Sequence, residues 1–383
     1  MTPPVAAVRP PRPGEDPWRY YAALRARGPV VRSAETGMVQ VVRYGAAVEA
    51  LTRPEISGAH PFRATRRVFG PNLLDLEGPR HRALRRVAAP EFRTRAVTGY
   101  AAGLVRPVVE RAVAPLVDRG PVDAVASFAA VVPVRVVAGV LGIPDGRAAE
   151  FYAGLAPVIR YLDRPEGNLL AALAARDRLD ARLAALVRAH RVDVGLLGRL
   201  LHDPGHGLDE HGLVRLVLLL VAAGTETTVR GLANLLAVLL AVPGRLAALR
   251  ADRSLIGPAV DETLRFEPPL HSTLRHATED TVLGGVAVPA GAALQVLLAS
   301  ANRDGRVFAG PDAWTPGRAG PRALTFGFGV HTCLGRTLAR LELVTALEVL
   351  LDRTSDVRAA GPPGPRAGTA FQGPSALPID CRS

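Results

Sequence analysis

The residues most able to do chemistry surround one cysteine, in the stretch Phe326-Gly327-Phe328-Gly329-Val330-His331-Thr332-Cys333-Leu334-Gly335. The glycines let the backbone turn sharply and approach a flat cofactor closely. A helix is predicted after Cys333, so its first N–H groups would point at the sulfur, stabilise a thiolate and lower the pKa of the thiol. The alternative is a small buried cysteine in a glycine turn, which the ten-residue pattern disfavours.

A second polar group interrupts the most apolar part of the chain, at Ala223-Gly224-Thr225-Glu226-Thr227-Thr228. An acid and a hydroxyl buried inside a helix cost free energy unless they serve each other or a ligand. Threonine hydroxyls can also loosen the helical hydrogen bonds, which makes room for water or oxygen. Between Val221 and Leu232, a solvated helix surface is a poor alternative. Glu226 and Thr227 are therefore candidate catalytic residues.

Two further pairs have helical spacing. Glu262 and Arg265 are three residues apart, so they share a helix face and can pair, although such pairs are mostly found on surfaces. His81 and Arg85 are four residues apart and also share a face, on a helix that is basic throughout. Spacing alone gives neither pair a function.

The scaffold for these residues is predicted to be mainly α with a small β part. The longest helix runs from 208 or 209 to about 242, spans roughly 50 Å and is apolar nearly all round, as a buried central helix should be. Other helices are predicted at 18–27, over most of 79–143, at 147–161, at 169–190 and after Cys333. Strands are predicted at 30–32 and 38–42, which form a hairpin, at 281–288, at 293–297, and as a last pair after residue 360. Residues 57–73 resemble an irregular surface loop.

Composition limits the function classes. The 383 residues carry a net charge of +12, and the basic residues are all arginine. Together with high Ala, Gly, Pro and Val use, this composition points to a GC-rich genome, such as that of an actinobacterium. The arginines are scattered and form no basic stripe with interleaved aromatic residues, so nucleic-acid binding is not expected and an acidic protein partner fits better.

The cysteines, the N-terminus and the apolar runs indicate in which compartment the protein lies and whether it is anchored in a membrane. Cys333 and Cys381 are the two cysteines, so no disulfide framework is expected and a reducing cytoplasm fits. The proline-rich N-terminus lacks the apolar segment of a signal peptide. The most apolar unbroken run, 216–223, is far shorter than the ~18 residues that span a bilayer. We therefore expect a cytoplasmic protein without a membrane anchor.

The segment around Cys333 resembles the haem-binding signature of the cytochrome P450 family, and the resemblance extends from Asp16-Pro17 to Leu377-Pro378. It implies the cytochrome P450 fold, with the long helix crossing the haem and minor antiparallel sheets, in one haem domain over 1–383 with a flexible segment 1–17. It also implies haem b with Cys333 as the iron ligand, in a binding segment that includes Phe326 and Gly335. A thiolate ligand favours O–O cleavage.

The same resemblance gives the other residues their roles. Glu226 would be the proton source and Thr227 the hydroxyl that assists dioxygen activation. Glu262, Arg265 and Arg318 would form a structural triad that holds the cysteine loop. His81, Arg85, Arg275 and His331 would contact the haem propionates. Ala323 departs from the family pattern, because many bacterial relatives have a histidine there.

By position in the family, the substrate pocket is lined by the 57–73 loop and a set of mostly apolar residues, namely Phe69, Leu219, Ala222, Ala223, His271, Ser272 and Phe371. This lining implies a small apolar substrate, while His271 is as readily placed at the haem edge or in water. Electrons from NAD(P)H would arrive through an acidic ferredoxin and its reductase, because no dinucleotide-binding loop or cysteine cluster is present. A monomer is expected.

Three functions remain open at this point. The first is hydroxylation or epoxidation in natural-product biosynthesis. The second is oxidative cyclisation or aryl coupling on the same haem, without net oxygen insertion. The third, of a different class, is a haem-based ligand carrier or sensor without turnover, which would have no use for Glu226 and Thr227.

Overall fold

The structure is a computed structural model that describes residues 11, 14–60, 63–188, 194–203, 205 and 207–383. Most of the predicted N-terminal segment 1–17 lies outside the described residues, as do the last two positions of the predicted helix 169–190.

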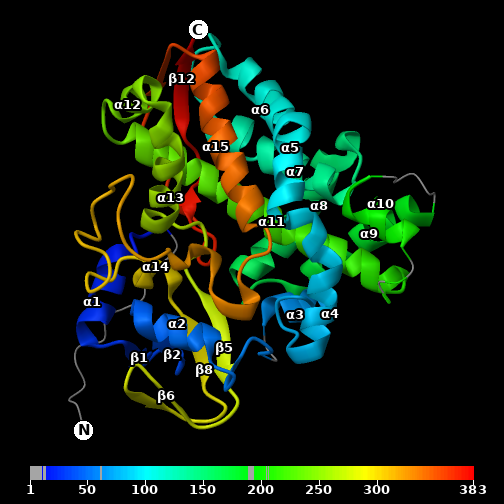
Figure 1. Cartoon of the computed structure of the whole chain (residues 1–383), viewed down its shortest axis with the longest axis vertical. Helices are drawn as coiled ribbons and strands as arrows, with labels where there is room; N and C mark the ends of the chain where they lie inside the picture. The colour runs from blue at the N-terminus through cyan, green and yellow to red at the C-terminus, as the bar shows by residue number, and fades with distance from the viewer. Residues whose placement is uncertain (1–10, 12–13, 61–62, 189–193, 204, 206) are drawn as a thin grey trace.

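The fold is built around the long helix α11, Glu210–Leu240, which passes through the middle of the molecule (Figure 1). Its 31 residues give a length of roughly 46 Å. The Asp209 side chain caps it by accepting a hydrogen bond from the Gly212 N–H (2.7 Å). Most of its side chains are buried against α7, α8, α9, α13 and α15, so the predicted buried central helix is confirmed.

The other helices surround α11. Before it come α1 Trp18–Arg27, α2 Tyr44–Thr52, α3 Ala64–Phe69, α4 Gly78–Ala88, α5 Thr94–Tyr100, α6 Arg106–Val113, α7 Val131–Leu141, α8 Asp145–Asp163, α9 Leu169–Arg188 and α10 Gly195–His202. After it come α12 Arg245–Ala251, α13 Ile256–Phe266, α14 Leu298–Ala301 and α15 Arg336–Arg353. One apolar core lies between α6, α7, α11, α13 and α15, and a second lies between α3, α7, α8, α9, α10 and α11.

The strands form small sheets at the periphery, the largest at the lower left of Figure 1 beside α1 and α2. Its strand order is β1-β2-β8-β5-β3, with antiparallel pairing except between β2 and β8. The strands of this sheet are β1 Val30–Arg32, β2 Val39–Val41, β3 Ile56–Ser57, β5 Thr273–Ala277 and β8 Ala293–Val296. The smaller sheets contain β4 Val122–Asp123, β6 Thr281–Leu283, β7 Val286–Val288, β9 Asp356–Ala359, β10 Arg366–Ala367, β11 Gly373–Pro374 and β12 Pro378–Arg382.

The prediction for residues 57–73 needs correction. Part of this stretch is the helix α3, whose Val68 and Phe69 are buried in the core with α8 and α9. Gly70, at φ +71°, ends the helix. Tertiary packing thus stabilises a helix too short to be stable alone. Strand β5 was also not predicted, because its alternation of buried and half-buried residues is only five residues long.

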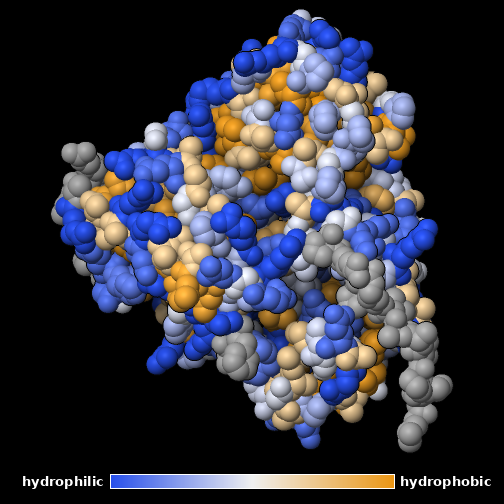
Figure 2. Space-filling view, turned by 180° about the vertical axis from the view of Figure 1, so that it is seen from behind, coloured by the Kyte–Doolittle hydropathy of each residue, from blue (hydrophilic) through white to orange (hydrophobic). Residues whose placement is uncertain are grey.

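By length and composition, α11 could cross a membrane, and so could Val125–Leu141 with Asp145–Asp163 if this pair, bent by 114°, were one span. The prediction from the unbroken apolar run did not detect this. However, 67% of the apolar window of α11 is buried inside the fold, as in the core helix of a folded protein. The surface seen from behind is largely hydrophilic, with separate apolar areas (Figure 2).

Candidate functional site

The cysteine loop, residues 326–335, follows the 3-10 turn Leu324–Phe326 and ends where α15 begins. A second 3-10 turn, Gly329–His331, lies inside it. Gly327 (φ +67°) and Gly329 (φ +72°) adopt backbone conformations that favour glycine. A Cβ on Gly329 would lie 2.6 Å from the Leu51 carbonyl oxygen, so α2 packs directly against the loop. The Cys333 N–H donates to the Phe326 carbonyl (2.8 Å), and Gly335 precedes the first residue of α15. The loop therefore closes on itself and presents Cys333 at the N-terminus of a helix, as predicted.

The electrostatics of Cys333 are a balance of opposing effects. Although the residue Cys333 is exposed, desolvation of its sulfur by the surrounding protein raises the pKa of the thiol above its ordinary value. The N–H groups of Gly335 and Arg336 and the charge of Arg85 lower this pKa, as expected, but do not outweigh desolvation. The predicted net lowering is therefore wrong for the protein chain by itself. A metal cation at the sulfur would supply the missing stabilisation, because coordination deprotonates a thiol outright.

His81 and His331 lie together beside the cysteine loop, with ring centroids 4.4 Å apart. His81 is 3% exposed, and its Nε2 has no hydrogen-bond partner among the residues that the structure describes. Burial, together with the charges of His331 and Arg85, lowers the pKa of His81 to about 4. The Nε2 of His331 lies 3.1 Å from an oxygen of Glu77. A buried imidazole nitrogen with no protein partner suits an acidic group of a ligand.

Arg85 and Arg275 extend this cluster. Arg85 donates to the Thr332 carbonyl (2.7 Å), directly before Cys333. Arg275 is 5% exposed in β5, and burial and the charge of Arg63 lower its pKa to about 10. The Glu77 carboxylate lies nearby and raises the pKa of Arg275. The structure thus brings the four predicted propionate contacts to one side of the cysteine loop.

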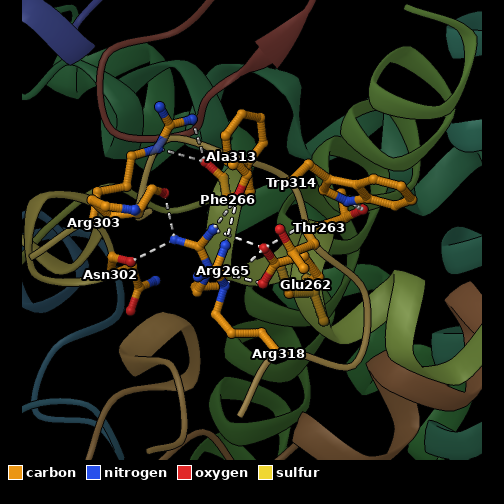
Figure 3. Close-up of polar contacts among 12 residues, drawn as sticks. Glu262, Thr263, Arg265, Phe266, Asn302, Arg303, Ala313, Trp314 and Arg318 are labelled. Atoms are coloured by element: carbon orange, nitrogen blue, oxygen red, sulfur yellow. Dashed lines mark hydrogen bonds and ion pairs between the residues drawn. The ribbon is translucent and has the colours of Figure 1, made fainter. Parts of the chain in front are cut away.

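The predicted structural triad is also assembled (Figure 3). Arg265 makes two hydrogen bonds of 2.8 Å to the Glu262 carboxylate, and both side chains are at least 96% buried. Arg318 donates to the same carboxylate (3.1 Å), as does the Thr315 N–H (2.8 Å). The N–H of Thr315 was not predicted as a partner.

A chain of hydrogen bonds joins this triad to the cysteine loop. Arg265 donates to the Asn302 carbonyl (2.8 Å), and the Asn302 side chain bonds the Leu324 N–H (2.6 Å) and the Thr325 hydroxyl (2.9 Å). Phe326, which follows them directly, accepts from the Cys333 N–H (2.8 Å). These contacts are what the predicted role of holding the loop requires.

Glu226 and Thr227 occupy different faces of α11. Thr227 is half-buried and Ala223 exposed within a helix that is otherwise largely buried, and the Thr227 hydroxyl donates to the Ala223 carbonyl (2.8 Å). Glu226 is 5% exposed and both of its oxygens are bonded, one to Arg230 (2.8 Å) and the other to the Tyr152 hydroxyl (3.1 Å). The acid is therefore fixed toward α8, and the hydroxyl lies on the accessible stripe of α11.

A cavity of 640 Å³ lies between α8, α9, α11 and the β10–β11 hairpin. Among the predicted pocket residues, Phe371 lines it, together with the predicted acid Glu226. Phe69, Leu219 and Ala222 are packed in the core with α8 and α9 instead. Ser272 accepts a hydrogen bond from Gln295 (3.3 Å).

His271 does not line this cavity, although its N–H donates to the carbonyl of Ala370, next to Phe371 (3.2 Å). It is 2% exposed, its Nδ1 lies 3.1 Å from the Tyr21 hydroxyl, and its ring packs against Trp18 of α1. The sequence predicts His271 in the substrate pocket, at the haem edge or in water, and does not predict this contact with α1.

Three residues at the site were missed by sequence reasoning. Arg230 lies four residues after Glu226, a spacing that does predict an ion pair on a helix. Glu77 directly precedes α4 and gave no signal of its contact with His331, 254 positions away. Tyr152 lies 74 positions from Glu226, so no local pattern connects them.

Comparisons with known proteins identify the family. The Cytochrome P450 family profile matches residues 188–355. The chain is 35% identical to "Cytochrome P450 monooxygenase PikC" of Streptomyces venezuelae, over 96% of this chain and 91% of the relative. It is 31% identical to "Cyclomarin C epoxidase CymV" of Salinispora arenicola, over 90% of each chain. It superposes on the crystal structure of P450BioI in complex with hexadec-9Z-enoic acid ligated acyl carrier protein with a TM-score of 0.89 and 27% identity, covering 96% of this chain and 99% of the other.

The chain belongs to the cytochrome P450 family, and it is a monooxygenase-type oxidoreductase. The family implies a haem iron, and the residues present fit that group. Cys333 offers a sulfur surrounded by N–H donors, His81 offers a buried nitrogen that no described residue bonds, and Arg85 and Arg275 supply cations on the same side of the loop.

Proposed function

We propose that residues 1–383 act as a single haem domain that hydroxylates or epoxidises a small apolar molecule in natural-product biosynthesis, as a cytoplasmic monomer. The observation that carries the proposal is the presentation of Cys333 at the N-terminus of α15, in a loop tied to the buried Glu262–Arg265 pair. The similarity to a relative named as a monooxygenase and to one named as an epoxidase supports this choice of reactions.

In this proposal Cys333 binds the iron of haem b, in the segment from Phe326 to Gly335. His81, Arg85, Arg275 and His331 hold the two propionates, since charge-assisted hydrogen bonds to carboxylates are the strong ones. When bound, haem supplies the chemistry that activates dioxygen. The protein side chains bind the haem and deliver protons.

In this proposal, Glu226 and Thr227 deliver protons to the active site. The Tyr152 hydroxyl and Arg230 both donate to the Glu226 carboxylate, which they hold as an acceptor at the inner wall of the cavity. To deliver a proton to the accessible face of α11, Glu226 must leave these partners and take up a proton from water. Thr227 is the hydroxyl on that face, where it can orient a donor.

Electrons from NAD(P)H are proposed to come through an acidic ferredoxin and its reductase. A second cavity, of 520 Å³, lies beside the cysteine loop and is lined by Arg318, Arg322, Arg336 and Arg340 as well as by Ala323. Arg318 is bonded to Glu262, which lines the cavity as well, but the other three arginines complement acidic groups on a partner, which favours rapid and correctly oriented docking.

The decisive experiment is the absorption spectrum of the reduced protein with carbon monoxide. We expect a thiolate-type adduct, and Cys333→Ser should lose it. Cys381→Ser is the matched control, because Cys381 is buried in β12, away from the loop, and should leave the adduct unchanged. An imidazole-type adduct in the unmodified protein, or no uptake of haem, would refute the proposal.

Product mass then separates the candidate functions. Hydroxylation or epoxidation adds one oxygen, whereas oxidative cyclisation or aryl coupling removes two hydrogens. Tight ligand binding with no turnover in the presence of ferredoxin, reductase and NAD(P)H would indicate a carrier or sensor. Candidate substrates can be found first by the optical shift that they cause at the haem.

A further inference from the structure

The walls of the 640 Å³ cavity belong to two separate parts of the chain. One wall is the end of α8, the turn after it and the start of α9, and it includes Pro157, Ile159 and Ala171. The opposite wall is the β10–β11 hairpin with α11, and it includes Phe371 and Arg230. A ligand that passes between these two walls must separate the turn from the hairpin.

One carboxylate connects the two walls. Asp163, the last residue of α8, accepts hydrogen bonds from three consecutive N–H groups at the tip of the hairpin, those of Thr369 (2.8 Å), Ala370 (2.9 Å) and Phe371 (3.0 Å). The charge of the carboxylate makes these bonds stronger than bonds between neutral groups. Asp163 also lines the cavity, as do Gly368 and Phe371.

The hairpin tip has the shape that this contact needs. Gly368 has φ +85°, and a Cβ there would lie 2.0 Å from the Phe371 carbonyl oxygen and 3.0 Å from the Asp163 carboxylate. Only glycine fits such a tight turn, which directs three N–H groups to one point. The binding site for the carboxylate is therefore built into the hairpin.

The hairpin is anchored to the core, whereas the turn is exposed. Gln372 donates to the Pro269 carbonyl (2.8 Å) and accepts from Asn234 of α11 (3.0 Å), and Arg230 donates to the Pro374 carbonyl (3.3 Å). Residues 164–168, which follow Asp163, are all exposed. If the walls separate, the turn is the part that is free to move, and the bonds to Asp163 are the ones that must break.

We propose that Asp163 and the N–H groups of Thr369, Ala370 and Phe371 form a latch, which closes an entrance between the α8–α9 turn and the β10–β11 hairpin. Asp163 is a positioning residue that sets how fast an apolar ligand enters and leaves the cavity. The ligand is the substrate of the proposed monooxygenase, so this inference rests on the proposed function. When the entrance opens, the carboxylate and the amides form hydrogen bonds with water in place of those with each other. The free-energy cost of opening is therefore moderate.

The test compares Asp163→Asn with the unmodified haem-loaded protein, with 4-phenylimidazole as a bulky probe and imidazole as a small one. Asparagine keeps the size but loses the charge that strengthens the three bonds. We expect the association and dissociation rates of 4-phenylimidazole both to rise roughly tenfold, with little change in the dissociation constant, because the latch affects the barrier. The rates for imidazole should change less.

Glu166→Gln is the matched control, because Glu166 is an exposed acid of the same turn and its loss removes an equal charge. Its rates should equal those of the unmodified protein. Amide hydrogen exchange at residues 369–371 supplies a second measurement, and it should be faster in Asp163→Asn only.

Two results would overturn the latch. Unchanged exchange at 369–371 would show that the carboxylate does not hold the hairpin, and faster exchange with unchanged 4-phenylimidazole rates would show that ligands enter elsewhere. The proposed function fails by a different result, a reduced carbon monoxide adduct without thiolate character. The exchange of three backbone amides and the spectrum of the carbon monoxide adduct are separate measurements on the haem-loaded protein, so the two failures are distinguishable.

Discussion

His81 combines burial, a lowered pKa and an Nε2 without a hydrogen-bond partner in the described part of the chain. Its pKa falls to about 4 because burial and the nearby charges of His331 and Arg85 disfavour the protonated imidazole. The unfolded chain, with an ordinary value of about 6.5, then binds more protons between these two pH values. The contribution of neutral His81 to the free energy of unfolding is therefore fully present above pH 6.5 and is lost as the pH falls toward 4.

This gives a prediction about haem removal. In the haem-free protein, the free energy of unfolding should fall between pH 6.5 and 4 more steeply than in His81→Gln. The exposed His211→Gln should behave like the unmodified protein. With haem bound, a propionate would accept a hydrogen bond from protonated His81 and reduce the slope. Equal slopes with and without haem, from denaturant titrations, would refute the propionate contact.

Thr227 can be tested at the same scale. Thr227→Ala removes the hydroxyl on the accessible stripe of α11, so proton delivery should fail while electron transfer continues. We expect a fall of about tenfold or more in product formed per NAD(P)H, with hydrogen peroxide released instead. Thr227→Ser keeps the hydroxyl and should retain most of the coupling. Equal coupling in the alanine variant would exclude a role for this hydroxyl.

Among the elements, α13 is linked to the cysteine loop through Arg265 and Asn302. Glu262 and Arg265 are buried and each bonds several groups, so removing one charge leaves the other uncompensated. Glu262→Gln should lower the free energy of unfolding by about 3–5 kcal/mol. Haem content should fall as well, because the hydrogen bonds from Asn302 to residues 324 and 325 depend on Arg265.

The control is the pair Asp261–Arg340, which joins α13 to α15 on the surface. Its contact is as short, at 2.7 Å, yet the side chains are 55% and 44% exposed. Asp261→Asn should cost less than about 1 kcal/mol. Similar losses in the two variants, measured by urea titration, would mean that burial does not explain the importance of the triad.

For the whole molecule, the net charge of +12 and the arginines of the second cavity favour an acidic redox partner. Raising the ionic strength from about 0.05 to 0.5 M shortens the screening length several-fold. The KM for ferredoxin should rise several-fold over this range, with little change in kcat. Arg340→Gln should raise the KM at low salt, whereas Arg178→Gln, an exposed arginine on α9, should not. Salt-independent kinetics would contradict electrostatic docking.

Local features of the sequence determined much of this protein. The apolar pattern and the Asp209 cap specify α11, and three-residue spacing places Glu262 beside Arg265. The glycines and the following helix give the cysteine loop its shape. Such features are predictable because helix periodicity, capping and positive φ depend on residues only a few positions apart.

Only the tertiary structure decided which distant residues meet. Tyr152 binds Glu226, His271 packs on α1, and Asp163 reaches Thr369 across 206 positions, none of which has a local signature. The raised pKa of the Cys333 thiol also follows only from the tertiary structure, because desolvation depends on everything packed around the sulfur. Contacts between distant segments are selected by packing of the whole core, since each side chain competes for space with many others.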